Sequence, residues 1–299
     1  MAIPDLLLGF SMAVLPQGGP PSASARHRLR PITLGVVGMM LMGVMVGCDT
    51  ASHQKLSLTG SSTVAPLAAE IAKRYEASHP GTRVDVQTGG SSRGISDARS
   101  GTAQIALVSR ALKPEEADLQ ATTIAIDGVA LIVNGANPVR SLSDDQIRAI
   151  YTGAISNWRQ VGGLDAPITV VNKAEGRSTL ELFLEHFRLD SRQIKASVVI
   201  GDNQQGILTV AADPHALGYV SIGTASQEAK AGMAIRLLPL AGIAPSLENV
   251  RSGRYPLSRP LNLVIQPPAA AGVAPFLAFA RSPEVHDLVE AQFFVPPAR

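Results

Sequence analysis

The chain has 299 residues, of which 45% are hydrophobic and 17% are charged, as is typical of a globular protein. Its formal net charge is +2 and only 4% of its residues are aromatic, so the composition argues against a nucleic-acid-binding protein. The single cysteine excludes an internal disulfide, and no cluster of cysteine and histidine has the spacing of a metal site. We therefore expect neither a metal nor a cofactor.

The N-terminal part of the chain has the features of an export signal. Residues 1–25 do not fit a signal peptide and are set apart from the fold, and residues 16–25 within them are a loop-like patch of low complexity. Three arginines, at positions 26, 28 and 30, then precede an apolar run that leads to Cys48. At about 15 residues, this run is short for a membrane span and suited to the core of a signal peptide.

The segment Met45-Val46-Gly47-Cys48 resembles the lipobox of bacterial lipoproteins, with Met45 where leucine is usual. The resemblance implies that residues 1–47 are a leader and signal peptide and that Cys48 is lipidated. The remaining chain would then be anchored to a membrane, in the periplasm or at the cell surface. Asp49 resembles the inner-membrane retention signal of Gram-negative lipoproteins. A plain signal peptide and a short membrane anchor remain alternatives, and both would also export the chain.

Beyond Cys48, strand-like and helix-like segments alternate. Alternating apolar and polar residues favour strands, whereas apolar residues four apart favour helices. The predicted strands are residues 55–60, 83–89, 103–109, 122–134, 167–172, 197–203, 216–222 and 255–266. The predicted helices are residues 64–81, 94–101, 113–120, 143–153, 178–187, 206–213 and 271–294, the last with a break at Ser282-Pro283. This order predicts an α/β protein with mainly parallel sheets.

Two extended segments are longer than a typical strand. Residues 124–134 lie in an apolar run that could hold two strands or cross between two lobes, and residues 255–266 form the second segment. Two crossover strands that bracket the middle of a chain are typical of a two-lobed protein with its ligand in the cleft. We expect one lobe to consist of residues 55–127 and 255–299, and the other of residues 128–254.

Three segments share one design, in which a strand ends in glycine, serine or threonine follows, and a helix begins. They are residues 58–67, 86–95 and 172–183. The first turn of a helix has unpaired N–H groups and a partial positive charge, so hydroxyl groups there can complete an anion site. A single serine or threonine at such a point is most often only a helix cap. Because helices that follow parallel strands begin at the same edge of a sheet, the three turns are predicted to converge.

Charged residues adjoin these turns. Arg110 ends one predicted strand, and Lys173 and Arg177 flank the third turn. Each of them is either a ligand-binding cation or a solvated surface charge. Asp127 lies within an apolar run, where an acid is unusual unless it is paired or functional. A structural ion pair and a ligand role are both open, and beside an anion site Asp127 could accept the proton of a protonated oxyanion.

A series of motifs runs through the chain: GSSTVAP, GGSSRGI, IALVSR, DGVALIVN, NPV, IYTGAISNW, VGG and GRST, with SLENVRSGRYPLSRPLNLVI near the end. In content and order they resemble the bacterial phosphate-binding proteins of phosphate ABC importers, over nearly all of the chain after residue 55. The resemblance implies the two-lobed periplasmic-binding-protein fold, whose lobes close on the ligand about a hinge. It also implies a monomer that captures inorganic phosphate for an ABC permease in the membrane and carries out no catalysis.

The resemblance also implies which residues hold the anion. They are Ser62, Thr63, Val64 (through its backbone N–H), Ser91, Ser92, Arg110, Asp127, Lys173, Arg177, Ser178 and Thr179. Arg110 stands where better-known relatives carry an acid, Lys173 replaces an arginine, and Arg177 replaces a serine. A site with these three cationic residues could hold a fully ionised oxyanion. Sulfate and molybdate are therefore the alternative ligands to phosphate.

An enzyme is a second alternative. Residues 90–94 fit the pattern G-x-S-x-G between a strand and a helix, with Ser92 as the nucleophile of a serine hydrolase. The pattern is common in turns rich in glycine and serine, and no HGGG-type motif for an oxyanion hole is present, so we expect a binding protein. An exported adhesion or signalling module with the same fold is a third alternative. Tyr151 and Trp158 are expected to be packing residues of the second lobe.

Overall fold

A computed structural model describes residues 54–297 of the chain. The predicted signal peptide and the predicted lipidation site at Cys48 lie outside the described residues. No helix within residues 54–297 is long and apolar enough to cross a membrane. The described residues form one compact unit.

Strands and helices alternate along the described chain. The strands are β1 (Gln54–Gly60), β2 (Thr82–Thr88), β3 (Ile105–Val108), β4 (Gln120–Asn134), β5 (Thr169–Lys173), β6 (Val198–Ile200), β7 (Ala216–Ser221), β8 (Ile235–Leu237) and β9 (Ser258–Ile265). The α-helices are α1 (Ala65–Ser78), α2 (Ser91–Arg99), α3 (Asp144–Tyr151), α4 (Ser178–Phe187), α5 (Asn203–Ala212), α6 (Ile222–Lys230), α7 (Leu247–Arg251), α8 (Val273–Arg281) and α9 (His286–Ala291).

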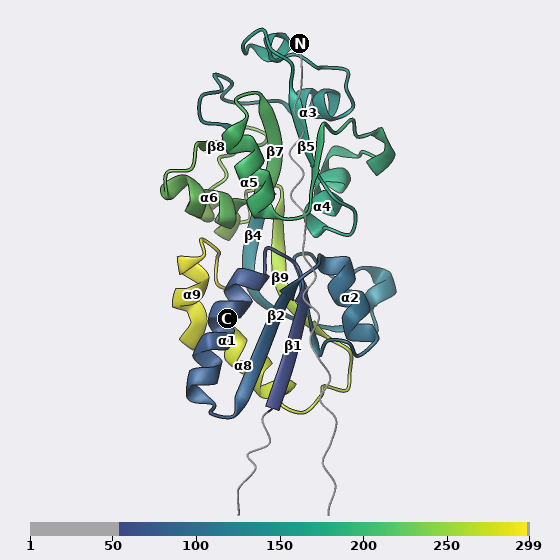
Figure 1. Ribbon diagram of the computed structural model, residues 1–299, viewed down its shortest axis with the longest axis vertical. Helices are drawn as coiled ribbons and strands as arrows, with labels where there is room; N and C mark the ends of the chain where they lie inside the picture. The colour runs from purple at the N-terminus through teal and green to yellow at the C-terminus, as the bar shows by residue number, and fades with distance from the viewer. Residues whose placement is uncertain (1–53, 298–299) are drawn as a thin grey trace, which may run out of the picture. The chain divides into compact units, whose positions relative to one another are not determined.

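The strands form one mixed sheet in the order β2-β1-β3-β9-β4-β7-β5-β6, with β8 paired to β4. At one end β1 is parallel to β2 and β3, and at the other end β5 is parallel to β6 and β7. Between them, β4 and β9 run antiparallel to each other and to their outer neighbours. Figure 1 shows these two strands side by side where they link the two halves of the fold. The predicted α/β fold with two crossover strands is confirmed.

Residues of β4 on the two sides of Asp127 belong to different hydrophobic cores, and two of these cores contain most of the buried hydrophobic residues. The first core contains Ala125 together with residues of β1, α1, β9 and α8. The second contains Val129 together with residues of α3, α4, β5 and β7. We call the part of the protein around the first core lobe 1 and the part around the second lobe 2. Asp127 lies between Ala125 and Val129 on β4, so this acid is at the junction of the two lobes.

Helix α1 illustrates how apolar spacing places an element. Leu67, Ile71 and Tyr75 recur every four residues on one face, and all three side chains are buried in the first core. Burying a side chain of this size contributes roughly 1.5–3 kcal/mol, so the apolar face fixes how α1 lies against the sheet. The start of α1 is thereby held at the carboxyl end of β1, where the first glycine and hydroxyl turn lies.

The structure contains three elements that the sequence pattern does not predict, namely α6, β8 and α7. The pattern of residues 113–120 predicts a helix, but only Pro114–Glu116 forms a short 3₁₀ turn, where the buried Glu116 pairs with Arg110. The apolar run of residues 122–134 belongs to a single strand of 15 residues that crosses between the lobes, which is one of the two possibilities left open by the sequence. The predicted break before Pro283 is confirmed, because α8 ends at Arg281 and Ser282 caps a 3₁₀ turn. Tyr151 and Trp158 are buried in the second core, as expected of packing residues.

Candidate functional site

The starts of three helices meet at the junction of the lobes. Thr63 lies just before α1 and Ser91 begins α2, both in lobe 1, while Thr179 lies in the first turn of α4 in lobe 2. The backbone N–H of Ser92 donates a hydrogen bond to the carbonyl oxygen of Gly176, with a distance of 3.3 Å between the two atoms. The second and third turns therefore touch across the junction.

A glycine permits this close approach. Gly90 precedes α2 with a φ of 97°, a conformation that favours glycine. A Cβ atom at this position would lie 2.8 Å from the carbonyl oxygen of Gly176 and 3.0 Å from Cδ of Arg177. The backbone of the second turn can therefore reach the third turn only because residue 90 has no side chain.

Arg259 is the centre of the polar contacts at the junction. It lies on β9 directly opposite Asp127 on β4, and the side chains of both residues are 1% exposed. The Nη2 atom of Arg259 donates to Asp127 Oδ2 at 3.0 Å and to Thr63 Oγ1 at 3.1 Å. Its Nη1 atom donates to Thr179 Oγ1 at 2.9 Å and to Ser109 Oγ at 3.3 Å. One guanidinium group therefore joins hydroxyl groups from both lobes.

Lys173 and Asn203 extend these contacts into lobe 2. Asn203 Nδ2 donates to Thr63 Oγ1 at 3.0 Å, and Lys173 Nζ donates to Asn203 Oδ1 at 3.1 Å. Burial lowers the pKa of the Lys173 ammonium to about 7, against an opposing effect of the negative charge of Asp202. The positive charges of Arg259 and Arg177 contribute to this lowering.

We call these residues the buried polar cluster. Its members are Thr63, Ser109, Asp127, Lys173, Thr179, Asn203 and Arg259, each at most 5% exposed. The cluster offers hydroxyl and amide donors and two cationic side chains against one carboxylate. Within residues 54–297 there is no group of histidine, cysteine, aspartate and glutamate that could hold a metal ion. The chemistry of the cluster therefore suits an anion rather than a metal.

Ser178 adds an unused donor beside the cluster. It is the first residue of α4, it is 2% exposed, and its Oγ atom has no hydrogen-bond partner in the described structure. A buried hydroxyl group without a partner is unfavourable by about 1–3 kcal/mol. An acceptor at the start of α4 would remove that penalty and would also meet the positive end of the helix.

The structure brings together several residues that the sequence suggests for the site. Thr63, Asp127, Lys173 and Thr179 belong to the cluster itself. Ser178, Ser91 and Val64 adjoin the cluster. The Oγ atom of Ser91 accepts a hydrogen bond from the N–H of Ser109 at 3.2 Å. The backbone N–H of Val64 donates to Ser61 Oγ at 3.4 Å. Asp127 forms an ion pair with Arg259, and a structural ion pair is one of the two possibilities that the sequence leaves open.

Arg110 lies outside the cluster, and two carboxylates already balance its charge. Its two Nη atoms donate to the buried Glu116 at 2.6 and 2.8 Å, and its Nε atom lies 2.7 Å from Glu181 Oε2 on α4. Burial acts to lower the pKa of Arg110, but the hydrogen bond and charge of Glu116, with the charge of Glu181, raise it overall. This guanidinium therefore joins the lobes through Glu181 and is not a free cation for a ligand.

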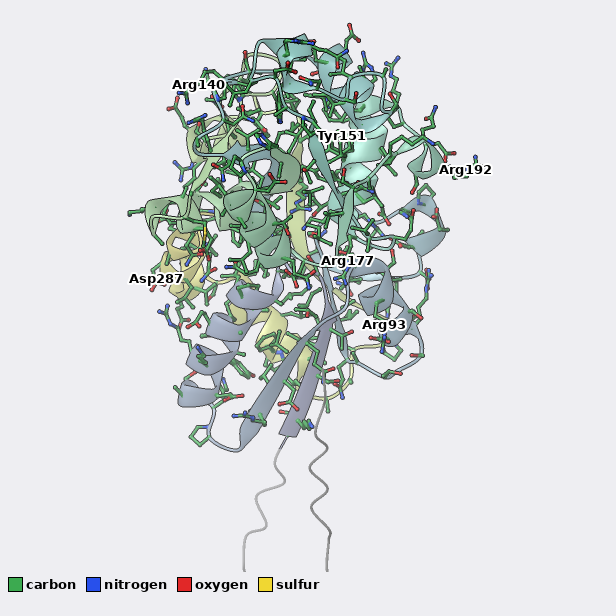
Figure 2. All side chains as sticks on the ribbon, turned by 45° about the horizontal axis from the view of Figure 1, so that its top comes forward. Arg93, Arg140, Tyr151, Arg177, Arg192 and Asp287 are labelled. Atoms are coloured by element: carbon green, nitrogen blue, oxygen red, sulfur yellow. The ribbon has the colours of Figure 1, made fainter. Side chains whose placement is uncertain are left out.

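The remaining predicted residues lie around the cluster. The hydroxyl group of Ser92 donates to Glu181 Oε1 at 3.3 Å. Ser62 is half-buried and lines a cavity of about 220 Å³ that Asn203 also lines. Arg177 is half-buried at the point where the third turn faces Gly90, and Figure 2 shows it at the junction of the lobes. A second cavity, of about 360 Å³, is lined by Arg110, Glu181 and Arg259 among others.

Arg259, Ser109 and Asn203 are absent from the set of residues predicted from the sequence. A signal for Arg259 was present: it lies within the second long extended segment, as Asp127 lies within the first, and two opposite charges in two buried strands suggest a pair. Ser109 follows β3 in the same way that the other hydroxyl residues follow their strands. Asn203 has no comparable signal, since it is simply the first residue of α5.

Comparison with known proteins identifies the family of this fold and site. The model of the PBP superfamily domain matches residues 48–284. The phosphate-binding protein PstS of Borreliella burgdorferi is 28% identical over 273 residues, which are 87% of this chain and 96% of that protein.

Two solved structures extend the comparison. A Clostridium perfringens protein assigned as a phosphate ABC transporter substrate-binding protein, solved with bound phosphate, has a TM-score of 0.77 and 30% identity. It covers 82% of this chain and 100% of its own. An ABC-type phosphate transport receptor from Vibrio cholerae has a TM-score of 0.68 and 32% identity, over 81% of this chain and 100% of its own. The chain therefore belongs to the PBP superfamily and, within it, to the family of phosphate-binding proteins of phosphate ABC importers.

Proposed function

We propose that this protein captures inorganic phosphate outside the cytoplasm and delivers it to the membrane permease of an ABC importer. The buried polar cluster is the observation that carries the proposal, because it gathers donors from both lobes around Arg259. A tetrahedral anion needs several donors from different directions. Charge-assisted hydrogen bonds are about twice as strong as neutral ones, so such a site would bind a phosphate firmly without any chemical step.

The contacts within the cluster also suggest how phosphate would enter. Arg259 donates to Thr63 of lobe 1 and to Thr179 of lobe 2, so these hydroxyl groups act as its acceptors in this arrangement. When the lobes separate, these hydrogen bonds break and the same groups become available to phosphate oxygens. Arg259 would then donate to phosphate, and the hydroxyl groups would turn from acceptors into donors.

We propose site roles for the residues predicted from the sequence on this basis. Phosphate would be bound by the side chains of Thr63, Lys173, Ser178 and Thr179, with Arg259 added. Ser62, Val64, Ser91, Ser92 and Arg177 would complete the rim of the site at the helix starts.

Asp127 would act mainly through Arg259. One of its carboxylate oxygens accepts from Arg259 and the other accepts from the N–H of Gly223 at 3.2 Å. Both carboxylate oxygens therefore already accept hydrogen bonds, which reduces the capacity of Asp127 to accept a further one from a protonated phosphate oxygen. Arg110 would hold the lobes together through Glu181 rather than touch the anion.

The remaining parts of the proposal concern export and organisation. Residues 1–47 would be removed as a leader and signal peptide, and Cys48 would carry the lipid anchor, in the periplasm or at the cell surface. Residues 55–127 and 255–299 would form lobe 1 and residues 128–254 would form lobe 2. The protein would act as a monomer, and lobe closure would present a new surface to the permease.

Calorimetric titration tests the proposed ligand. Residues 54–297 form one compact unit, so the chain from Thr50 onward is stripped of bound anions and titrated with phosphate, sulfate and molybdate at matched ionic strength. Tight binding of phosphate alone is expected. Binding of sulfate or molybdate without phosphate would contradict the ligand assignment and leave the fold assignment intact. Turnover of generic acyl esters that disappears in Ser92→Ala would instead support a hydrolase.

A further inference from the structure

The charges of the buried polar cluster do not cancel when Lys173 is protonated. Arg259 is paired with Asp127 at 3.0 Å. Lys173 is 3% exposed, and no carboxylate in the described part of the chain lies within 4.0 Å of its Nζ atom. Within residues 54–297, its one side-chain hydrogen bond is to the neutral amide of Asn203. Among the charged side chains of the cluster, the ammonium group of Lys173 is therefore the one that no carboxylate of residues 54–297 pairs with.

In the described part of the chain, the surroundings of Lys173 compensate its positive charge only in part. Asp202, at the start of α5, attracts the ammonium only at a distance, since its carboxylate caps α5 by accepting from the N–H of Gln205 at 2.8 Å. Arg259 on β9 and Arg177 before α4 both repel it. The hydroxyl group of Tyr219 on β7 accepts from the backbone N–H of Lys173 at 3.4 Å and carries no charge. An unpaired buried ammonium is costly, so the neutral amine competes with it.

We propose that Lys173 makes anion capture proton-linked: the side chain is a neutral amine in the empty closed site and takes up one proton when the anion binds. The proposal rests on the proposed function, since phosphate is the anion that supplies the missing negative charge. The lone pair of Nζ accepts a proton from solvent, one N–H bond forms, and no bond of the anion is broken. The resulting ammonium then pairs with the bound anion.

This linkage determines how affinity depends on pH. Below about pH 7 the ammonium is already present in the empty site, because burial lowers its pKa only to about 7. At higher pH each binding event must take up a proton, so the affinity for a given anion charge falls by about tenfold per pH unit. Lys173→Arg supplies a side chain that stays protonated throughout this range, so that variant should lack the dependence.

Proton counting by calorimetry is the test, with inorganic phosphate as the probe. The chain from Thr50 onward is titrated at about pH 8.5, where phosphate is a dianion and the Lys173 amine is neutral, in two buffers of different ionisation enthalpy. The wild-type protein should take up close to one proton more per phosphate than Lys173→Arg. Any protonation of the phosphate itself contributes equally to both proteins. Lys73→Arg, a substitution at a lysine whose side chain is 71% exposed, is the matched control and should behave as the wild type.

The outcomes separate this inference from the proposed function. Equal proton uptake in the wild type and in Lys173→Arg, with phosphate bound by both, would overturn the role of Lys173 and leave the phosphate function standing. Absence of phosphate binding to the wild type would overturn the function and the linkage together. If Lys173→Arg does not bind, NMR of the wild type with isotope-labelled lysine decides. A buried lysine that titrates near neutral pH without phosphate and far above it with phosphate supports the proposal, and a lysine unaffected by phosphate contradicts it.

Discussion

Arg259 and Asp127 bury a full positive and a full negative charge at the point where the two lobes meet. Each side chain is 1% exposed, so water does not solvate either charge and the ion pair stabilises both. The pair also orients the guanidinium, because Asp127 holds its Nε and Nη2 atoms while the remaining nitrogen faces Thr179 and Ser109. At the scale of single residues, recognition therefore depends on how firmly one carboxylate fixes one arginine.

Asp127→Asn should expose that dependence. Removing one partner of a buried ion pair leaves the other charge uncompensated, which is typically worth about 3–5 kcal/mol of unfolding free energy. Denaturant unfolding measures the loss, and phosphate titration should show weaker binding. Asp85→Asn is the control, since Asp85 pairs with Lys55 at the surface, with 34% and 67% of their side chains exposed. Equal stability of the two variants would contradict the role of the buried pair.

Lys173 predicts a pH dependence of stability in the empty protein. Its pKa is about 7 when folded against 10.5 when unfolded, so between these values the unfolded state binds more protons and stability rises with pH. Below about pH 7 both states are charged and the full cost of burying the ammonium is present. Lys173→Met should therefore be more stable than the wild type by a few kcal/mol at pH 6, with the gap closing toward pH 10. A gap that does not change with pH in thermal unfolding would count against this reading.

At the scale of elements, helix α4 supplies residues to the proposed anion site and also to the ion pairs that join the two lobes. Its first turn supplies Ser178 and Thr179. One turn later, Glu181 lies 2.7 Å from Arg110 Nε and 3.4 Å from Lys113 Nζ in lobe 1. Glu181 is partly exposed, with 25% of its side chain accessible, so these ion pairs contribute less than buried ones. Because these ion pairs join residues of the two lobes, they form only when the lobes are together. They therefore stabilise the closed state relative to the open state.

Glu181→Gln should weaken closure more than it weakens folding. We expect the affinity for phosphate to fall several-fold, up to about tenfold, because the closed state is less populated. The midpoint of thermal unfolding should change little. Glu185→Gln, four residues further along α4, is the matched control, because no ion pair of Glu185 is present in residues 54–297. Small-angle scattering with and without phosphate measures closure, and unchanged closure in Glu181→Gln would contradict the role of Glu181.

Gly90→Ala tests the contact between the second and third turns. The new Cβ atom would lie 2.8 Å from the carbonyl oxygen of Gly176, so α2 and the turn before α4 could not approach as they do here. Phosphate affinity should fall by at least tenfold, on the order of 1.4 kcal/mol or more. Gly101→Ala also introduces a side chain at positive φ, but nothing lies within 4 Å of its Cβ position. An equal loss of affinity in both variants would mean that backbone strain, and not the contact, is the cause. Unchanged affinity in Gly90→Ala would contradict the role of the contact.

For the molecule as a whole, the sequence reveals the elements more readily than the contacts between them. The apolar runs predict the two long strands, and Asp127 within one of them predicts a partner or a ligand. Its partner, Arg259, lies 132 residues away on the other strand. Only the register of β4 against β9 places the two side chains together, and neither strand contains that register within itself.

Arg110 shows the opposite case. Its position after β3, beside the predicted anion site, favours a ligand role when the sequence is considered alone. The folded chain instead brings Glu116 from a nearby turn and Glu181 from the other lobe to it. A cationic side chain near a site is thus available to a ligand only if no carboxylate of the protein already pairs with it. Whether one does depends on the packing of the whole molecule.

A crystal structure of the phosphate-bound protein tests most directly whether the buried polar cluster is the binding site. Phosphate is expected within hydrogen-bond distance of the Arg259 guanidinium and of the Thr63 and Thr179 hydroxyl groups. The direct hydrogen bonds from Arg259 to those two hydroxyl groups, now 3.1 and 2.9 Å long, should be replaced by bonds to phosphate oxygens. Phosphate bound elsewhere, with these two hydrogen bonds intact, would contradict the assignment of the site.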